Sequence, residues 1–126
     1  MSKSRILVVE DDPKIARALV VRLKAGGYET ATAFDAVGAT SMAVQQRPDL
    51  VLLDISMPGG DGFIVAERLQ KSAVTAGTPM IFLTASKEPA LRERAAELGA
   101  AAFFEKPYDS EELLSAIRDA VGEAVH

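Results

Sequence analysis

The sequence of 126 residues contains no cysteine and no tryptophan, and its single histidine is His126, the last residue. Without cysteine the chain has no disulfide, no thiolate ligand for a metal ion and no cysteine nucleophile. With one histidine, neither a Ser-His-Asp triad nor a histidine-rich metal site is expected. The lack of cysteine is compatible with a reducing cytosol.

The chain also lacks an excess of positive charge and a long apolar run. Fourteen lysines and arginines stand against 18 aspartates and glutamates, a formal net charge of −4, so there is no basic surface for sequence-independent nucleic-acid binding. No run approaches the roughly 20 apolar residues that cross a bilayer, and the start lacks the features of a secretory signal. We therefore expect a cytoplasmic protein that contacts no membrane and does not itself bind nucleic acid.

The length and composition suit one globular domain with a sizeable core. Hydrophobic residues make up 48% of the chain and charged residues 25%, as in ordinary globular proteins. No repeat, composition shift or low-complexity linker marks a boundary. We expect a single domain over residues 1–126.

Five segments have the character of β-strands. Residues 6–9, 50–53, 80–83 and 100–104 are apolar throughout, as in strands of a parallel sheet that is covered on both faces. Residues 28–33 alternate in polarity and are therefore placed at a sheet edge.

Helical patterns fill the intervals between these runs. In the first, Asp12 is a candidate N-cap, Pro13 suits the first turn, and a glycine pair ends the helix. Its predicted apolar face consists of Ile15, Ala18, Leu19 and Leu23. Further helices are predicted over 35–46, 63–71, 91–98 and 109–121. The helix over 35–46 has the weakest pattern, and its larger apolar side chains are Val37, Met42 and Val44.

Strictly alternating strands and helices predict an α/β fold with a doubly wound parallel sheet and right-handed crossovers. Five strands favour the flavodoxin-like order 2-1-3-4-5, with five helices distributed over both faces. In such sheets ligands lie outside the carboxyl ends of the strands, where the strand order reverses. That point lies between the first and third strands.

Carboxylates gather at this predicted crevice. The first strand ends in Glu10, Asp11 and Asp12, and the third ends in Asp54. Because clustered carboxylates repel one another, a cation between them is expected, and oxygen ligands favour Mg²⁺.

Two other strand ends add a hydroxyl and an ammonium group. Thr84 ends the fourth strand and Lys106 follows the fifth. A carboxylate nucleophile, a metal ion and a lysine together suit phosphoryl transfer. Taken singly, each residue has a simpler interpretation, such as Asp12 as a helix cap. Their joint occurrence at strand ends favours a site.

These motifs resemble the receiver domains of two-component response regulators, including the chemotaxis type. The resemblance covers nearly the whole chain and rests on residues 6–12, 48–58, 61–62, 78–85, 99–100 and 106–107. It implies that Asp54 accepts a phosphoryl group from a phosphohistidine on a sensor histidine kinase or a histidine phosphotransfer protein. It also implies that Glu10, Asp11, Asp54 and the backbone carbonyl of Ser56 hold Mg²⁺.

The resemblance assigns roles to further residues. Lys106 would neutralise a phosphoryl oxygen, with a cis bond to the proline that follows it. Thr84 resembles the switch hydroxyl, and Phe103, where tyrosine is common, resembles the aromatic residue whose rotamer follows that hydroxyl. Ser56 and Ser86 would flank the path of the water that removes the phosphate, and both could instead be simple loop serines.

The implied protein is a signalling switch that catalyses its own gain and loss of phosphate rather than a turnover enzyme. Its output surface would comprise the fourth helix, fifth strand and fifth helix, contacted by a downstream protein or an output domain, with a phosphorylation-dependent homodimer as a further expectation. It could be free-standing or part of a longer protein. The alternatives are an adaptor that binds partners without phosphorylation, an aspartate-nucleophile phosphatase and a flavin-binding electron carrier. Against the phosphatase, Ser56 stands where a second aspartate is needed.

Overall fold

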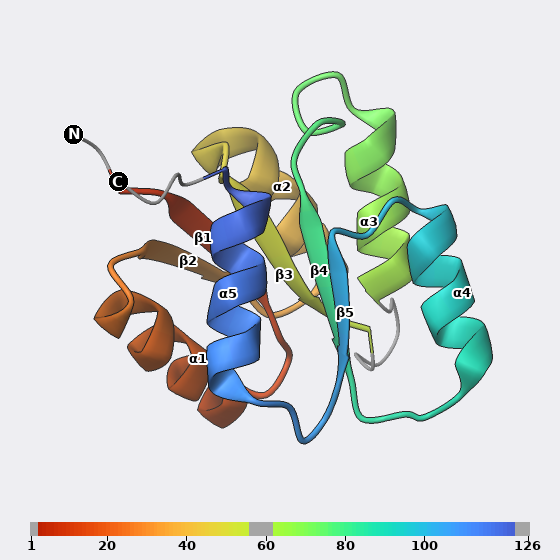
Figure 1. Cartoon of the computed structure of the whole chain (residues 1–126). Helices are drawn as coiled ribbons and strands as arrows, with labels where there is room; N and C mark the ends of the chain where they lie inside the picture. The colour runs from red at the N-terminus through yellow and green to blue at the C-terminus, as the bar shows by residue number, and fades with distance from the viewer. Residues whose placement is uncertain (1–2, 56–61, 123–126) are drawn as a thin grey trace.

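The computed structural model describes residues 3–55 and 62–122, in which strands and helices alternate along the chain (Figure 1). The strands are β1 (Arg5–Val9), β2 (Glu29–Ala33), β3 (Leu50–Asp54), β4 (Met80–Thr84) and β5 (Ala102–Glu105). The helices are α1 (Pro13–Ala25), α2 (Ala36–Gln46), α3 (Gly62–Lys71), α4 (Pro89–Glu97) and α5 (Ser110–Ala120). No helix within these described ranges is long and apolar enough to cross a membrane.

The five strands form one parallel sheet in the order β2-β1-β3-β4-β5, which confirms the predicted topology. The strand order reverses between β1 and β3, where Val9 pairs with Leu53. On the other side of β3, Asp54 pairs with Leu83 of β4. The carboxyl ends of the three central strands therefore lie side by side.

Helices cover both faces of the sheet. Successive side chains of each strand point to opposite faces, so each face has a core of its own. On one face Ile6, Val8 and their neighbours pack against α1 and α5. On the other, Leu7 and Val9 belong to the core under α2, α3 and α4 (Figure 1). The uninterrupted apolar runs of the central strands follow from this double coverage.

The buried face of α1 differs from the predicted one. Leu19 and Leu23 are buried as expected, but Ile15 is 38% exposed and Ala18 is exposed too, whereas Ala16 is only 2% exposed. Ala16 is small enough to be buried where the helix packs closely on the rest of the fold. Ile15 and Ala18 instead line a hollow of about 320 Å³ beside the start of α5.

Helix α2 forms where the sequence pattern was weakest, because local hydrogen bonds support it. Asp35 caps it by accepting a bond from the Gly38 amide at 2.7 Å. Its buried side chains are Ala39 and Ala43 rather than the larger apolar residues of its pattern.

The fifth strand begins two residues later than predicted, at Ala102. Gly99 has a φ of +78°, a left-handed conformation that ends the preceding helical segment. Ala101 then donates a backbone hydrogen bond to Met80 just before the strand starts.

Candidate functional site

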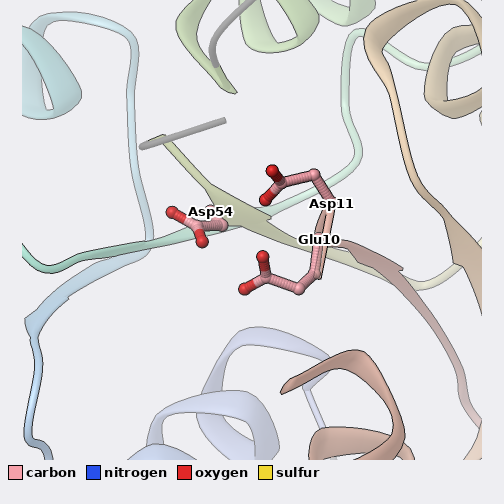
Figure 2. A group of neighbouring side chains, drawn as sticks. All are labelled: Glu10, Asp11 and Asp54. Atoms are coloured by element: carbon pink, nitrogen blue, oxygen red, sulfur yellow. The ribbon is translucent and has the colours of Figure 1, made fainter. Parts of the chain in front are cut away.

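Three carboxylates from two neighbouring strand ends converge at the reversal point of the sheet (Figure 2). Glu10 and Asp11 follow β1, and Asp54 is the last residue of β3. One oxygen of each carboxylate lies within 4.8 Å of the others. Glu10 and Asp54 are buried, whereas Asp11 is exposed, so the cluster opens to solvent on the side of Asp11.

The backbone after β1 fixes the position of Glu10. Its amide donates to the Ala33 carbonyl at 3.0 Å, which extends the pairing of β1 with β2. Its Oε2 accepts a bond from the Asp12 amide at 3.2 Å. Asp12 in turn caps α1 by accepting from the amides of Lys14 and Ile15. The prediction of Asp12 as a cap is therefore confirmed.

A glycine lets α3 begin directly behind Asp54. A Cβ atom at Gly62 would lie 2.9 Å from the Asp54 carbonyl oxygen and 2.8 Å from the Cγ2 of Ile55. Any other residue would push the helix away from the end of β3. The close contact between the start of α3 and the end of β3 therefore requires a glycine at position 62.

Lys106 brings a positive charge to the cluster from the end of β5. Its Nζ donates to Asp54 Oδ2 at 3.2 Å and lies 3.6 Å from Glu10 Oε1. Its backbone amide donates to the Thr84 carbonyl at 2.7 Å, which anchors the lysine to β4. The bond from Lys106 to Pro107 is cis, as predicted.

The charges of the site perturb one another. Burial, together with a hydrogen bond to Asp54 and its charge, raises the pKa of Glu10 to about 8. Burial lowers the pKa of Lys106, but the charges of Asp54 and Glu10 outweigh it, so this pKa is raised. Without a further cation, Glu10 therefore holds a proton at neutral pH while Lys106 stays charged.

The donor atoms of this cluster fit a hard divalent cation. Glu10 Oε1 is buried and accepts no hydrogen bond from residues 3–55 or 62–122, although the Lys106 ammonium is nearby. Oxygen ligands supplied by a few carboxylates, with one open side for water, suit Mg²⁺. The three carboxylates therefore suggest a magnesium site.

Thr84 ends β4 beside this group and is fully buried. Its Oγ1 accepts a hydrogen bond from the Ser86 amide at 3.0 Å. Ser86 Oγ accepts from the Glu88 amide at 3.2 Å. The threonine hydroxyl is thus tied to the loop that leads into α4.

Phe103 lies on β5, on the sheet face covered by α4, and is partly buried. The Arg92 guanidinium sits 4.7 Å from the centre of its ring and 3.6 Å from Glu105 Oε1. Lys87 lies 3.8 Å from the other oxygen of Glu105. Sequence reasoning missed Arg92, because nothing in the sequence pattern says which α4 residue faces β5.

Ser56 lies outside the described residues, so its predicted contribution to metal binding stays a prediction. Of the other predicted site residues, Glu10, Asp11, Asp54 and Lys106 come together, and Thr84 lies at the adjacent strand end. Phe103 is separate from this cluster and packs with α4.

Two curated relatives are similar to nearly the whole chain. The DNA-binding dual master transcriptional regulator RpaA of Synechocystis is 37% identical over 114 residues, which cover 90% of this chain and 47% of that protein. Response regulator PleD of Caulobacter vibrioides is 39% identical over 115 residues, which cover 91% of this chain and 25% of PleD. The chain thus spans about half the length of these relatives or less.

Solved structures share the fold. The receiver domain of sensor histidine kinase PA1611 from Pseudomonas aeruginosa, described with a magnesium ion coordinated in its active-site cleft, superposes with a TM-score of 0.87 at 27% identity. The match covers 97% of this chain and all of that one. The response regulator receiver domain family matches residues 6–118. With this match and the site at the sheet's reversal point, the chain belongs to the response regulator receiver domain family.

Proposed function

We propose that residues 1–126 form one receiver domain that is switched by phosphorylation of Asp54. Family membership implies phosphorylation-dependent signalling. The observation that carries the assignment to Asp54 is its buried carboxylate, which lies 3.2 Å from the Lys106 ammonium and within a cluster of two further carboxylates. The phosphoryl donor is a phosphohistidine on a sensor histidine kinase or a histidine phosphotransfer protein.

In the proposed reaction a carboxylate oxygen of Asp54 attacks the phosphorus of the donor. The new P–O bond gives an acyl phosphate, while the P–N bond breaks and its electron pair stays on the imidazole. Glu10, Asp11, Asp54 and the Ser56 carbonyl would hold Mg²⁺, which when bound would supply positive charge for the phosphoryl oxygens.

The chain's own residues orient and stabilise the transferred group. Lys106 already contacts Asp54 and would neutralise a phosphoryl oxygen. The Thr84 hydroxyl would exchange its bond with the Ser86 amide for one to the phosphoryl group. The rotamer of Phe103 would then follow the movement of the Thr84 hydroxyl.

The output surface of this proposal comprises α4, β5 and α5. Lys87 and Arg92 of the α4 region flank Glu105 of β5, and Arg92 covers the ring of Phe103. A shift of the loop that contains Lys87 would rearrange these exposed charges. A downstream protein, an output domain or a second phosphorylated copy would recognise the rearranged surface.

The proposal is tested by intact mass after incubation with acetyl phosphate and Mg²⁺. We expect the addition of one phosphoryl group, its loss in excess chelator, and no addition in Asp54→Asn. Asp49→Asn, an exposed aspartate outside the site, is the matched control and should be phosphorylated normally. Uptake that persists in Asp54→Asn would refute the assignment.

Loss of the phosphate is expected to slow when bulk is added beside the site. We propose that Ser56 and Ser86 flank the approach of the attacking water, and small side chains leave this in-line path open. Ser86 is partly buried in the loop after β4. Ser86→Tyr should lengthen the phosphorylated lifetime several-fold, as measured by phosphate decay after donor removal.

A matched variant controls for loop disturbance in this test. Ser86→Thr keeps the hydroxyl that accepts from the Glu88 amide and should change the lifetime much less. Equal decay in the parent and in Ser86→Tyr would rule out a gating role for Ser86.

A further inference from the structure

The outward face of α2 presents apolar side chains to solvent. Val37 is 74% exposed and Val44 is 42% exposed. With Thr40, Ser41 and Gln45 they recur at helical spacing and line a hollow of about 440 Å³. The buried face of the helix is formed by other residues, so packing against the sheet does not explain these valines.

Helix α2 also differs from the other helices in charge. Residues 36–46 contain no aspartate, glutamate, lysine or arginine, whereas each of the other four helices contains charged residues. Charged residues ordinarily occupy the solvent side of a surface helix. An uncharged outer face with exposed valines is therefore typical of a helix that packs against a partner.

Opposite charges lie at the two ends of this uncharged helix. Asp35 immediately precedes the helix and Arg47 immediately follows it, and both are exposed. In an antiparallel pair, Arg47 of one copy would lie near Asp35 of the other, and the same pairing would form at the opposite end. The opposite signs therefore favour an antiparallel copy of the same helix over a parallel one.

The sequence of the outer face is compatible with a two-fold axis. If the axis passes between Thr40 and Ser41, Val37 of one copy lies opposite Val44 of the other, and the same contact forms twice. The short side chains of Thr40 and Ser41 at the centre allow the helix axes to approach. A self-complementary contact of this kind closes as a dimer.

We propose that the α2 face binds a second copy of this chain in an antiparallel, two-fold symmetric helix pair. The inference does not depend on phosphorylation of Asp54, because it uses none of the site residues. The interface is weak, since a helix of this length covers less than the roughly 1,200–2,000 Å² of a standard interface. Arg68 of α3, at the rim of the hollow, adds like charge from both copies and limits the affinity further.

Register-specific cross-linking tests the pair. Because the sequence contains no cysteine, only introduced cysteines can form a disulfide. Val37→Cys and Val44→Cys chains are prepared separately, with different affinity tags, and mixed under mild oxidation without a phosphodonor. In the proposed pair the two different cysteines face each other across the contact between the helices. In a pair of the same variant the two cysteines lie about 10 Å apart along the direction of the helices, beyond the roughly 7 Å Cα separation that a disulfide spans.

We expect the mixed Val37→Cys and Val44→Cys disulfide to exceed either same-variant disulfide by at least tenfold. Val74→Cys, another exposed valine, mixed with Val44→Cys measures random collision. Predominant Val37→Cys homodimers would indicate parallel pairing and overturn the proposal. Equal yields in all mixtures, or none above the Val74→Cys background, would overturn it as well.

Sedimentation of the cysteine-free chain provides an independent measurement. Val44→Lys adds to the positive charge that Arg68 of both copies brings to the contact and should weaken self-association at least tenfold, while Val74→Lys should not. Circular dichroism verifies that both variants remain folded. A dimer that is unchanged in Val44→Lys, or a parent that stays monomeric at millimolar concentration, would contradict the α2 interface.

Discussion

Replacing Lys106 by methionine is expected to lower the free energy of unfolding of the metal-free protein by about 2 kcal/mol at pH 8, because it leaves buried carboxylates without their positive partner. The Nζ atom lies 3.2 Å from Asp54 and 3.6 Å from Glu10, and the lysine side chain is only 24% exposed. Under the proposed function, phosphate uptake should also fall on the order of 100-fold, since Lys106 would stabilise the transferred group. Urea unfolding and donor-dependent mass shifts measure the two effects.

Lys87→Met is the matched control for this variant. Lys87 also pairs with a glutamate, but at 3.8 Å and with its side chain 74% exposed. Exposed ion pairs contribute little to stability, so the unfolding curve of Lys87→Met should stay close to that of the parent. Equal destabilisation by the two substitutions would show that Lys106 has no special role in balancing the charges of the cluster.

The metal-free protein should lose stability as the pH rises from about 5 to 8. The pKa of Glu10 is raised from its ordinary value of 4.5 to about 8 in the folded state, so between these values the folded chain holds a proton that the unfolded chain has released. The stabilisation that Glu10 provides is fully present below its ordinary pKa of 4.5 and is lost as the pH rises through its folded-state pKa of about 8. The expected loss is about 2–4 kcal/mol.

Glu10→Gln should flatten this dependence, because an amide cannot release the proton. Glu67→Gln, which changes a partly exposed glutamate that pairs with Arg94 of α4, should keep the slope of the parent. Urea midpoints between pH 5 and 8, in the presence of a chelator, give the comparison. A slope that is the same in the parent and in Glu10→Gln would mean that Glu10 titrates normally.

The topology and the carboxylate cluster were predictable because each depends on short-range features of the sequence. Uninterrupted apolar runs such as 50–53 indicate strands buried on both faces, and their alternation with helices leaves few arrangements. Parallel strands end at one edge, so polar residues at strand ends meet there. Glu10, Asp54 and Lys106 could therefore be grouped without knowledge of any distance.

Features that depend on packing could not be predicted. The sequence pattern favoured Ile15 over Ala16 for the buried face of α1, because apolar size counts in a pattern while close approach to the sheet does not. The exposure of Val37 and Val44 on α2 could not be predicted either, because the pattern records that these side chains are apolar but not how the helix packs. The partnership of Arg92 with Phe103 depends on the rotation of α4, which its sequence does not specify.

Lys106 follows the last strand, so it joins the carboxylate cluster only when the sheet is complete. Its partner Asp54 precedes it by 52 residues, and β5 reaches the sheet only through β4. A chain that is still emerging from the ribosome can present its acidic residues before the lysine arrives. Only a finished sheet combines both, so under the proposed phosphorylation of Asp54 an unfinished chain would be a poor acceptor.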